Sequence, residues 1–199
     1  MIPIMLRLKK AAHREVAKAQ DLVVEALYEA FDEAVLHGGT SIWRCYGGNR
    51  FSEDVDVYIP RDTKKLAKFF SMLEKRGFVV EKRKIGERSL YSTVRFNRTI
   101  VRFEAVFKTV SGSLKEYETA EGNLLTVYTL KPEELVGEKV AAYLNRFKVR
   151  DLYDIFFLLR HVEDFSRIKK ALEELLARFK APVDEKDLKV LILEGLVPD

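Results

Sequence analysis

Apolar residues alternate with polar ones along much of the first two thirds of the chain, whereas the last third repeats them every three or four positions. In residues 54–59, three apolar side chains alternate with Asp54, Asp56 and Tyr58. Successive side chains of a strand point to opposite faces of the sheet. The pattern therefore predicts a strand that buries its apolar face and displays both acids on the other.

Similar patterns predict the other elements before residue 130. A glycine pair lies between a short strand and a helix, and Asp62 opens a further helix that Gly77 ends. Segments rich in β-branched and aromatic residues then predict a run of strands. The predicted helices span 5–18, 21–33 and 62–77, and one begins after Gly39; the predicted strands span 34–37, 54–59, 78–84, 89–96, 99–108, 114–118 and 124–128.

Helical spacing dominates after residue 130. Pro132, followed by two glutamates, is a strong helix opening, and Pro182 separates a last helix over about 185–193. We therefore expect an α+β fold in which a mixed sheet flanked by helices is followed by a C-terminal helical bundle. The expected division is 1–130 for the α/β domain with its N-terminal helices and 131–199 for the helical subdomain.

Composition narrows the class of protein. The 199 residues are 47% hydrophobic and 33% charged, and their apolar runs are too short to cross a bilayer. Residues 1–10 do not combine a basic leader with a long apolar core, so export is not expected. Cys45 is the single cysteine and can form neither an internal disulfide nor a thiolate cluster. We expect a soluble cytoplasmic protein without membrane contact.

Positive charge is concentrated in the first part of the chain. Residues 61–108 hold 14 basic and 5 acidic side chains, including Lys82, Arg83 and Lys84, although the whole chain carries only +4. This segment is a candidate surface for a polyphosphate. Charge alone is equally consistent with a face that merely keeps the protein in solution.

Gly38 and Gly39 occupy the predicted strand-to-helix turn. Glycine lets the backbone approach a phosphate closely, and the unpaired N–H groups at a helix start carry partial positive charge. Thr40 and Ser41 add hydroxyls at the same place. The turn is therefore a candidate binding site for the phosphates of a nucleotide.

Asp54 and Asp56 are the candidate metal ligands. Two carboxylates on one face of a strand can share divalent cations, which stabilise the attacking and leaving oxygens in a displacement at phosphorus. The predicted strand at 99–108 places Glu104 on the face opposite its apolar residues, and this makes it the candidate third carboxylate. The alternative for Glu104 is a surface ion pair with Arg102 or Arg95.

The loop between the glycine pair and the acids contributes further candidates. Either Arg44 or Arg50 can contact phosphate or simply fasten the loop, and Arg44 is expected on an exposed helix side. Ser52 can bind the nucleotide or bond the local backbone. Trp43 and Cys45 are expected in the core.

The glycine pair and the Asp-x-Asp of Asp54 and Asp56 resemble the signature of the polymerase-beta-like nucleotidyltransferase superfamily. Gly38-Gly39-Thr40 with Arg50-Phe51-Ser52-Glu53-Asp54-Val55-Asp56 looks like the AbiEii/AbiGii toxin-like branch of that superfamily. A later lysine and an Arg-Asp-x-Tyr-Asp motif of this branch are similar to Lys139 and to residues 150–154. The resemblance spans about residues 35–160.

This resemblance implies a nucleotidyltransferase that uses Mg²⁺, with two ions expected and Mn²⁺ as an alternative. It transfers a nucleotide from a nucleoside triphosphate to an acceptor, for which RNA and in particular a tRNA 3′ end is expected. A role as a toxin with a cognate antitoxin is implied by the branch alone. A protein acceptor, or a catalytically inactive module that binds a nucleotide or RNA, stays open as an alternative, and so does an antitoxin-like or structural partner.

Within the resemblance, Lys139 binds the triphosphate and serves in catalysis, and Arg50 is preferred over Arg44 as a phosphate ligand. Asp151 positions or deprotonates the acceptor. From the residues alone, Lys139 can instead be a lysine at the edge of the core, and Asp151 can be the N-cap of a helix. Asp154 is expected to pair with Arg150.

Overall fold

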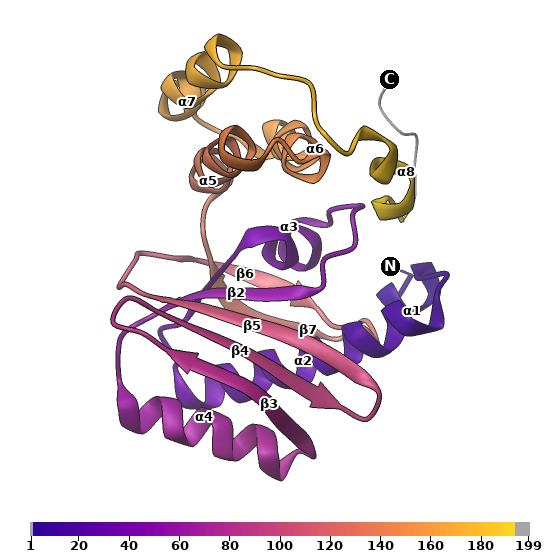
Figure 1. The fold of residues 1–199 in the computed structure, drawn as a ribbon, viewed down its shortest axis with the longest axis vertical. Coiled ribbons are helices and arrows are strands. Elements are labelled where there is room, and N and C mark those ends of the chain that lie inside the picture. The colour runs from indigo at the N-terminus through magenta and orange to yellow at the C-terminus, as the bar shows by residue number, and fades with distance from the viewer. Residues whose placement is uncertain (1, 194–199) are drawn as a thin grey trace.

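The computed structural model describes residues 2–193, without the side chains of 190 and 191, and is organised around one mixed sheet (Figure 1). The strands lie in the order β3-β4-β5-β2-β1-β7-β6. Their bounds are β1 (Val35–His37), β2 (Asp54–Ile59), β3 (Phe78–Ile85), β4 (Ser89–Phe96), β5 (Thr99–Phe107), β6 (Ser113–Glu118) and β7 (Leu124–Thr129). The α+β expectation is confirmed, and each predicted strand is present.

Helices lie on both sides of this sheet (Figure 1). Helices α2 and α4 cover one face, whereas α3 packs on the other and contacts α5 and α6. Their bounds are α1 (Ile4–Arg7), α2 (Ala11–Ala30), α3 (Gly38–Tyr46), α4 (Thr63–Lys75), α5 (Pro132–Arg146), α6 (Val149–Leu158), α7 (Phe165–Ala177) and α8 (Leu188–Leu191), with 3-10 turns η1 (Leu159–His161) and η2 (Glu185–Asp187). The carboxylate-bearing face of β2 is thus turned toward α3 and the C-terminal helices.

The alternation of apolar and polar residues in β2 buries one face of the strand and leaves the acids on the other, as predicted. Val55 and Val57 are fully buried, while Asp54 and Asp56 on the other face are partly exposed. The apolar face joins a core that includes Leu27 of α2, Phe69 of α4 and Phe103 of β5. A second core lies among α3, α5, α6 and α7. Both cores hold the acids at fixed positions between the sheet and the C-terminal helices.

The N-terminal helices differ from the prediction. Instead of helices over 5–18 and 21–33, the chain forms short α1 and then a single helix, α2, through residues 19–21. Asp21 is inside that helix, and its carboxylate accepts hydrogen bonds from Tyr117 Oη at 3.1 Å and Ala120 N at 2.7 Å. The helix therefore continues through Asp21, whose polar side chain is satisfied by partners on β6 and just after it.

Arg44 is buried, contrary to the expectation of an exposed helix side. Its guanidinium lies 3.3 Å from Asp21 and donates to the carbonyls of Ala17 and Glu118. Trp43 beside it is buried as predicted, and Cys45 packs against both cores. Arg44 therefore fastens α3 to α2 and β6 and has no exposed surface for a phosphate.

The C-terminal helices begin as predicted, with Pro132 in the first turn of α5 and Glu134 accepting from the Lys131 N–H. The helix predicted over 185–193 is shorter in the structure, where η2 and α8 together end at Leu191. The residues after α8 turn back toward the loop before β2, since Leu193 N donates to Asn49 O.

The predicted division of the chain at residues 130 and 131 stays a prediction. None of the described helices combines the length and the hydrophobicity that a membrane span requires.

Candidate functional site

The glycine pair forms the start of α3 and touches the acids of β2. Gly38 has a φ of 68°, a left-handed conformation, and a Cβ at this position would collide with the Asp56 carboxylate. A Cβ on Gly39 would lie 2.6 Å from both Arg50 Nη2 and Ser52 Oγ. Glycine at position 38 therefore lets the helix start approach the Asp56 carboxylate, and glycine at position 39 leaves room for the side chains of Arg50 and Ser52.

The hydroxyls after the glycine pair face the interior. Thr40 and Ser41 are fully buried; the Thr40 hydroxyl donates to the Asp54 carbonyl, and the Ser41 hydroxyl lies 2.8 Å from Thr129 Oγ1. The Ser52 carbonyl accepts from Gln20 at 2.9 Å. These contacts fasten α3 to β2 and β7. Phosphate at this turn would meet the backbone N–H groups of the helix start, since the two hydroxyls already have partners.

Three carboxylates share one face of the sheet. Strands β2 and β5 are parallel, and Asp56 pairs in register with Glu104, while Asp54 pairs with Arg102. On its other side, Asp56 pairs in register with His37 of the antiparallel strand β1. Paired residues of neighbouring strands project to the same face, so Asp54, Asp56 and Glu104 share that face as predicted, while their role as metal ligands stays a prediction.

The electrostatics of this cluster favour a cation. Burial raises the pKa of Asp56, and the Asp54 carboxylate adds to this effect, while His37 opposes it. Burial also raises the pKa of Glu104, with Asp56 and Asp54 both adding. Hard oxygen ligands and mutual repulsion are the conditions that a divalent cation relieves. The carboxylate oxygens are donors of the chemical type that Mg²⁺ and Mn²⁺ prefer.

Arg102 supplies positive charge to the cluster. Its Nε donates to the Asp54 carboxylate, and its Nη2 lies 3.5 Å from Glu53. Within residues 2–193, no three His, Cys, Asp or Glu side chains are already gathered closely enough to hold a metal ion. The alternative of an ion pair between Glu104 and Arg102 or Arg95 is not formed in the described structure, because Arg102 pairs with the other acids and Arg95 pairs with Glu81.

Arg50 connects the loop before β2 to the C-terminal helices. Its Nε and Nη2 each lie 2.8 Å from a different oxygen of Asp154, and its Nη1 donates to the Phe51 carbonyl. Lys139 Nζ lies 2.7 Å from the same Asp154 carboxylate. Burial alone would raise the pKa of Asp154, but Arg50 and Lys139 hold it below its usual range. The expected pair of Asp154 with Arg150 is wrong, since Asp154 binds these two cations instead.

Asp151 lies at the other end of the same ionic network. It is fully buried, accepts from Arg146 Nε and Nη2 at 2.7 Å each, and lies 3.6 Å from Lys139 Nζ. Lys148 rather than Asp151 is the N-cap of α6, so the N-cap alternative is wrong. Lys139 also lowers the pKa of Asp56 electrostatically. The network thus brings Lys139 and the half-exposed Arg146 to the carboxylates of the sheet.

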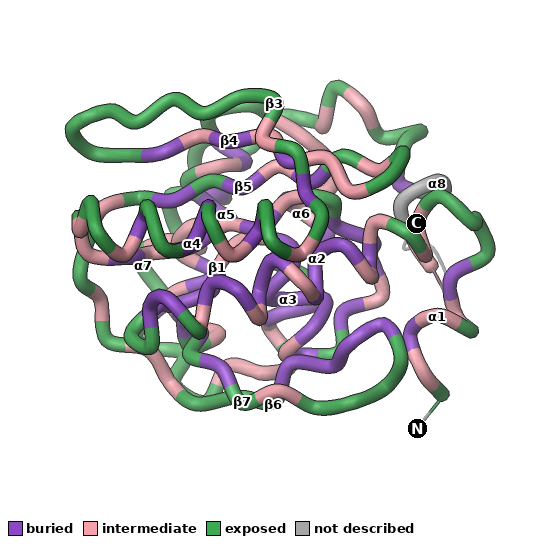
Figure 2. Tube along the Cα trace, turned by 90° about the horizontal axis from the view of Figure 1, so that it is seen from below, coloured by how far each residue is buried: buried purple, intermediate pink, exposed green. Residues whose placement is uncertain are grey.

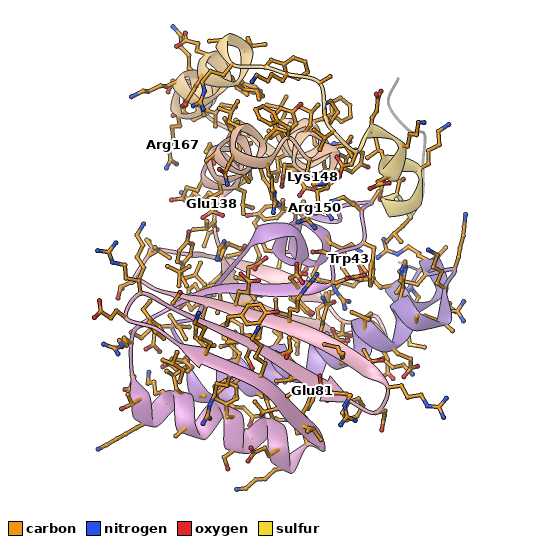
Figure 3. All side chains as sticks on the ribbon, viewed as in Figure 1. Trp43, Glu81, Glu138, Lys148, Arg150 and Arg167 are labelled. Carbon is orange, nitrogen blue, oxygen red and sulfur yellow. The ribbon has the colours of Figure 1, made fainter. Side chains whose placement is uncertain are left out.

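His37, Tyr58 and Glu138 form a contact that sequence reasoning missed. His37 Nδ1 lies 3.1 Å from Glu138 Oε2, and Tyr58 Oη donates to Glu138 Oε1 at 2.5 Å. The rings of His37 and Tyr58 stack with centroids 4.2 Å apart. Glu138 lies between α5 and the sheet (Figure 3). The available signals were the neighbours: His37 precedes Gly38, and Glu138 precedes Lys139.

Comparisons with solved structures identify this architecture. JHP933 from Helicobacter pylori superposes with a TM-score of 0.63 at 22% identity, over 96% of this chain and 86% of that one. ANT(2'')-Ia in complex with adenylyl-2''-tobramycin matches at a TM-score of 0.51 and 14% identity, over 81% of this chain and 99% of that one. The Megavirus polyadenylate synthase matches at 0.51 and 11%, over 79% of this chain and 34% of that one. These likenesses show a fold shared with nucleotidyltransferases.

The sequence itself matches a family. No curated protein matches the chain significantly. The family described as "Nucleotidyl transferase AbiEii toxin, Type IV TA system" matches residues 21–195, a span that contains every site residue named above. The resemblance drawn from the glycine pair, the two aspartates and the later lysine is thereby confirmed. The chain is a nucleotidyltransferase and belongs to the AbiEii toxin family.

Proposed function

We propose that this protein transfers a nucleotide from a nucleoside triphosphate to the 3′ end of an RNA, with tRNA as the expected acceptor, in a reaction that requires divalent metal. The observation that carries the proposal is the register of Asp54, Asp56 and Glu104 beside the start of α3. Metal ions held there, two Mg²⁺ or Mn²⁺ in our proposal, would polarise the α-phosphate and the attacking oxygen.

In this proposal the triphosphate lies between α3 and α5. The backbone N–H groups that follow Gly38 and Gly39 bind phosphate oxygens. Lys139 and Arg146 face them from α5 and neutralise the charge that develops on the departing pyrophosphate. Asp151 and Asp154 are positioning residues, because their oxygens hold these cations and Arg50 in place.

The chemical step exchanges one P–O bond for another. A terminal hydroxyl oxygen of the acceptor attacks the α-phosphorus, the bond to the bridging oxygen of the β-phosphate breaks, and pyrophosphate leaves. The hydroxyl proton passes to a carboxylate of the cluster, for which Glu104 is the candidate because its side chain is exposed and it pairs in register with Asp56. As its family implies, we further propose that an antitoxin protein opposes this activity.

Labelled nucleotides test the proposal. The protein is incubated with each α-³²P nucleoside triphosphate, Mg²⁺ and total RNA, beside Asp56→Ala and a matched surface variant, Asp32→Asn, whose carboxylate is 92% exposed. We expect label in RNA with the unchanged protein and with Asp32→Asn, and none with Asp56→Ala. Label in protein would indicate that the acceptor is a protein. Triphosphate binding without any nucleotide transfer would indicate an inactive binding module.

A further inference from the structure

One half of the sheet keeps an open face next to the carboxylates. The face of β3, β4 and β5 that carries Glu104 has no helix packed on it in the described chain, whereas α2 and α4 cover the opposite face (Figure 1). Strand β3 is exposed along most of its length (Figure 2). A solvent-exposed sheet face that begins at a nucleotidyl transfer site is positioned to meet the acceptor.

The strand register leads from the acids to an aromatic ring and a lysine. Asp56 pairs with Glu104, Glu104 with Tyr91, and Tyr91 with Lys84. Four residues from four adjacent strands therefore form one row on one face. With strands about 4.8 Å apart, the row extends ~14 Å from Asp56 to the edge strand.

The next row adds a second unpaired cation. Lys82 pairs in register with Thr93, and its Nζ lies 5.2 Å from the centroid of the Tyr91 ring. Neither Lys82 nor Lys84 forms an ion pair with any described residue. Ile100 and Val106, on the same face of β5, are 50% and 38% exposed. Two lysines without a carboxylate partner, an aromatic ring that one of them contacts and exposed apolar side chains thus share this face.

Other basic residues of the same strands have partners in the fold. Arg83 points to the opposite face, where its guanidinium lies 4.9 Å from the Phe70 ring centroid. Arg95 bonds Glu81 at 2.6 Å. A face that served only to keep the protein in solution would not require the unpaired lysines to gather around Tyr91 on the side of the acids.

We propose that this open face, defined by Lys82, Lys84 and Tyr91, binds the single-stranded 3′ segment of the RNA acceptor. A base stacks on Tyr91, Lys82 moves from its contact with that ring to a backbone phosphate, Lys84 contacts a second phosphate, and the terminal hydroxyl reaches the carboxylates at Asp56. Stacking requires unpaired bases, so a single strand fits this face and a duplex does not. The inference rests on the proposed function, because it assigns the acceptor's binding surface.

RNA binding without metal or nucleotide tests the surface separately from the chemistry. The probe is a short fluorescein-labelled single-stranded oligoribonucleotide, and its anisotropy is followed over a range of salt concentrations. The test variants are K82Q/K84Q and Tyr91→Ala. The matched controls are Arg83→Gln, which removes a cation from the same strand on the opposite face, and Tyr91→Phe, which keeps the ring.

We expect K82Q/K84Q to bind the probe about tenfold more weakly at low salt, with the salt slope reduced by ~1.4 for two lost phosphate contacts. Tyr91→Ala should weaken binding about tenfold, and Tyr91→Phe should retain it. Arg83→Gln should change binding by less than about twofold. Annealing the probe to its complement should weaken binding to the unchanged protein.

The inference would be overturned if the unchanged protein did not bind the probe at low salt, or if Arg83→Gln lost as much binding as K82Q/K84Q. It would also be overturned if a polyglutamate peptide bound as tightly and with the same losses. Triphosphate binding is measured on the same variants by equilibrium dialysis. If K82Q/K84Q binds triphosphate and RNA normally, the surface is wrong while the proposed function stands. If the unchanged protein binds RNA but transfers nothing, the proposed function fails and the surface stands.

Discussion

Arg102 donates from its Nε to the carboxylate of Asp54, its cross-strand partner, and so places a guanidinium against one of the proposed metal ligands. A positive guanidinium at this carboxylate disfavours the approach of a divalent cation through charge repulsion. The Arg102 side chain is 43% exposed, so it has room to turn from Asp54 toward an incoming phosphate.

We expect Arg102→Gln to bind divalent metal several-fold more tightly than the unchanged protein when no nucleotide is present, because the internal competitor is gone. Titration calorimetry with Mn²⁺ measures this directly. Arg98→Gln, an exposed arginine in the β4–β5 turn, is the control and should leave the affinity unchanged. Equal or weaker metal binding by Arg102→Gln would show that the guanidinium does not compete with metal.

Asp56→Asn should abolish metal binding and transfer while it stabilises the metal-free fold. A carboxyl whose pKa is raised in the native state disfavours folding in its ionised form at neutral pH, so removal of the charge should raise the free energy of unfolding by about 1 kcal/mol. Urea unfolding in the presence of a chelator measures it. Asp54→Asn loses the ion pair with Arg102 and should not gain stability; equal gains in both variants would contradict the explanation.

Asp154→Asn should be strongly destabilising at neutral pH, because it leaves the buried charges of Arg50 and Lys139 without their carboxylate. A loss of about 3–5 kcal/mol is typical for breaking a buried ion pair. Since the native pKa of Asp154 is lowered, its contribution is present above the ordinary value of 3.8 and disappears as pH falls through the native value.

Urea unfolding from about pH 7 to about pH 3 should therefore show a difference between Asp154→Asn and the unchanged protein that shrinks in acid. Glu173→Gln removes an exposed carboxylate of α7 and serves as the control, with little effect expected. A pH-independent difference would mean that Asp154 contributes through packing rather than through its charge.

Gly38→Ala should cost more stability than Gly47→Ala, although both glycines have φ near 70°. The left-handed conformation costs about 1–2 kcal/mol for any L-residue. A Cβ at Gly47 meets nothing within 4 Å, whereas one at Gly38 collides with Asp56. Thermal unfolding and metal titration of both variants measure this, and metal binding should be lost in Gly38→Ala alone. Equal behaviour of the two variants would disprove the close approach of the turn to Asp56.

Local patterns predicted what depends on local geometry. The period of two placed Asp54 and Asp56 on one face, and the same reasoning placed Glu104, because strand side chains alternate whatever the tertiary fold. The helix break near Asp21 was wrong for the complementary reason: this aspartate is satisfied by Tyr117 and Ala120, which are distant in sequence and visible only once the chain is folded.

The contacts between side chains within the site could not be predicted from local patterns either. Arg50 and Asp154 are 104 residues apart, and His37 and Glu138 are 101 apart, so no spacing rule relates them. Arg50 was expected on phosphate, but its donors are directed at Asp154 and a backbone carbonyl. The ligand roles of Arg50, Ser52 and the two buried hydroxyls stay predictions.

The contact of Arg50 with Asp154 also constrains how this chain can change over generations. Replacement of Asp154 leaves the buried cations Arg50 and Lys139 without their shared acid, whereas replacement of Arg50 leaves Asp154 with Lys139 alone. We therefore expect the acid to be the less replaceable partner, and a chimera that joins the front of this protein to the helices of a distant homologue to be stable only if the exchanged piece brings a matching acid.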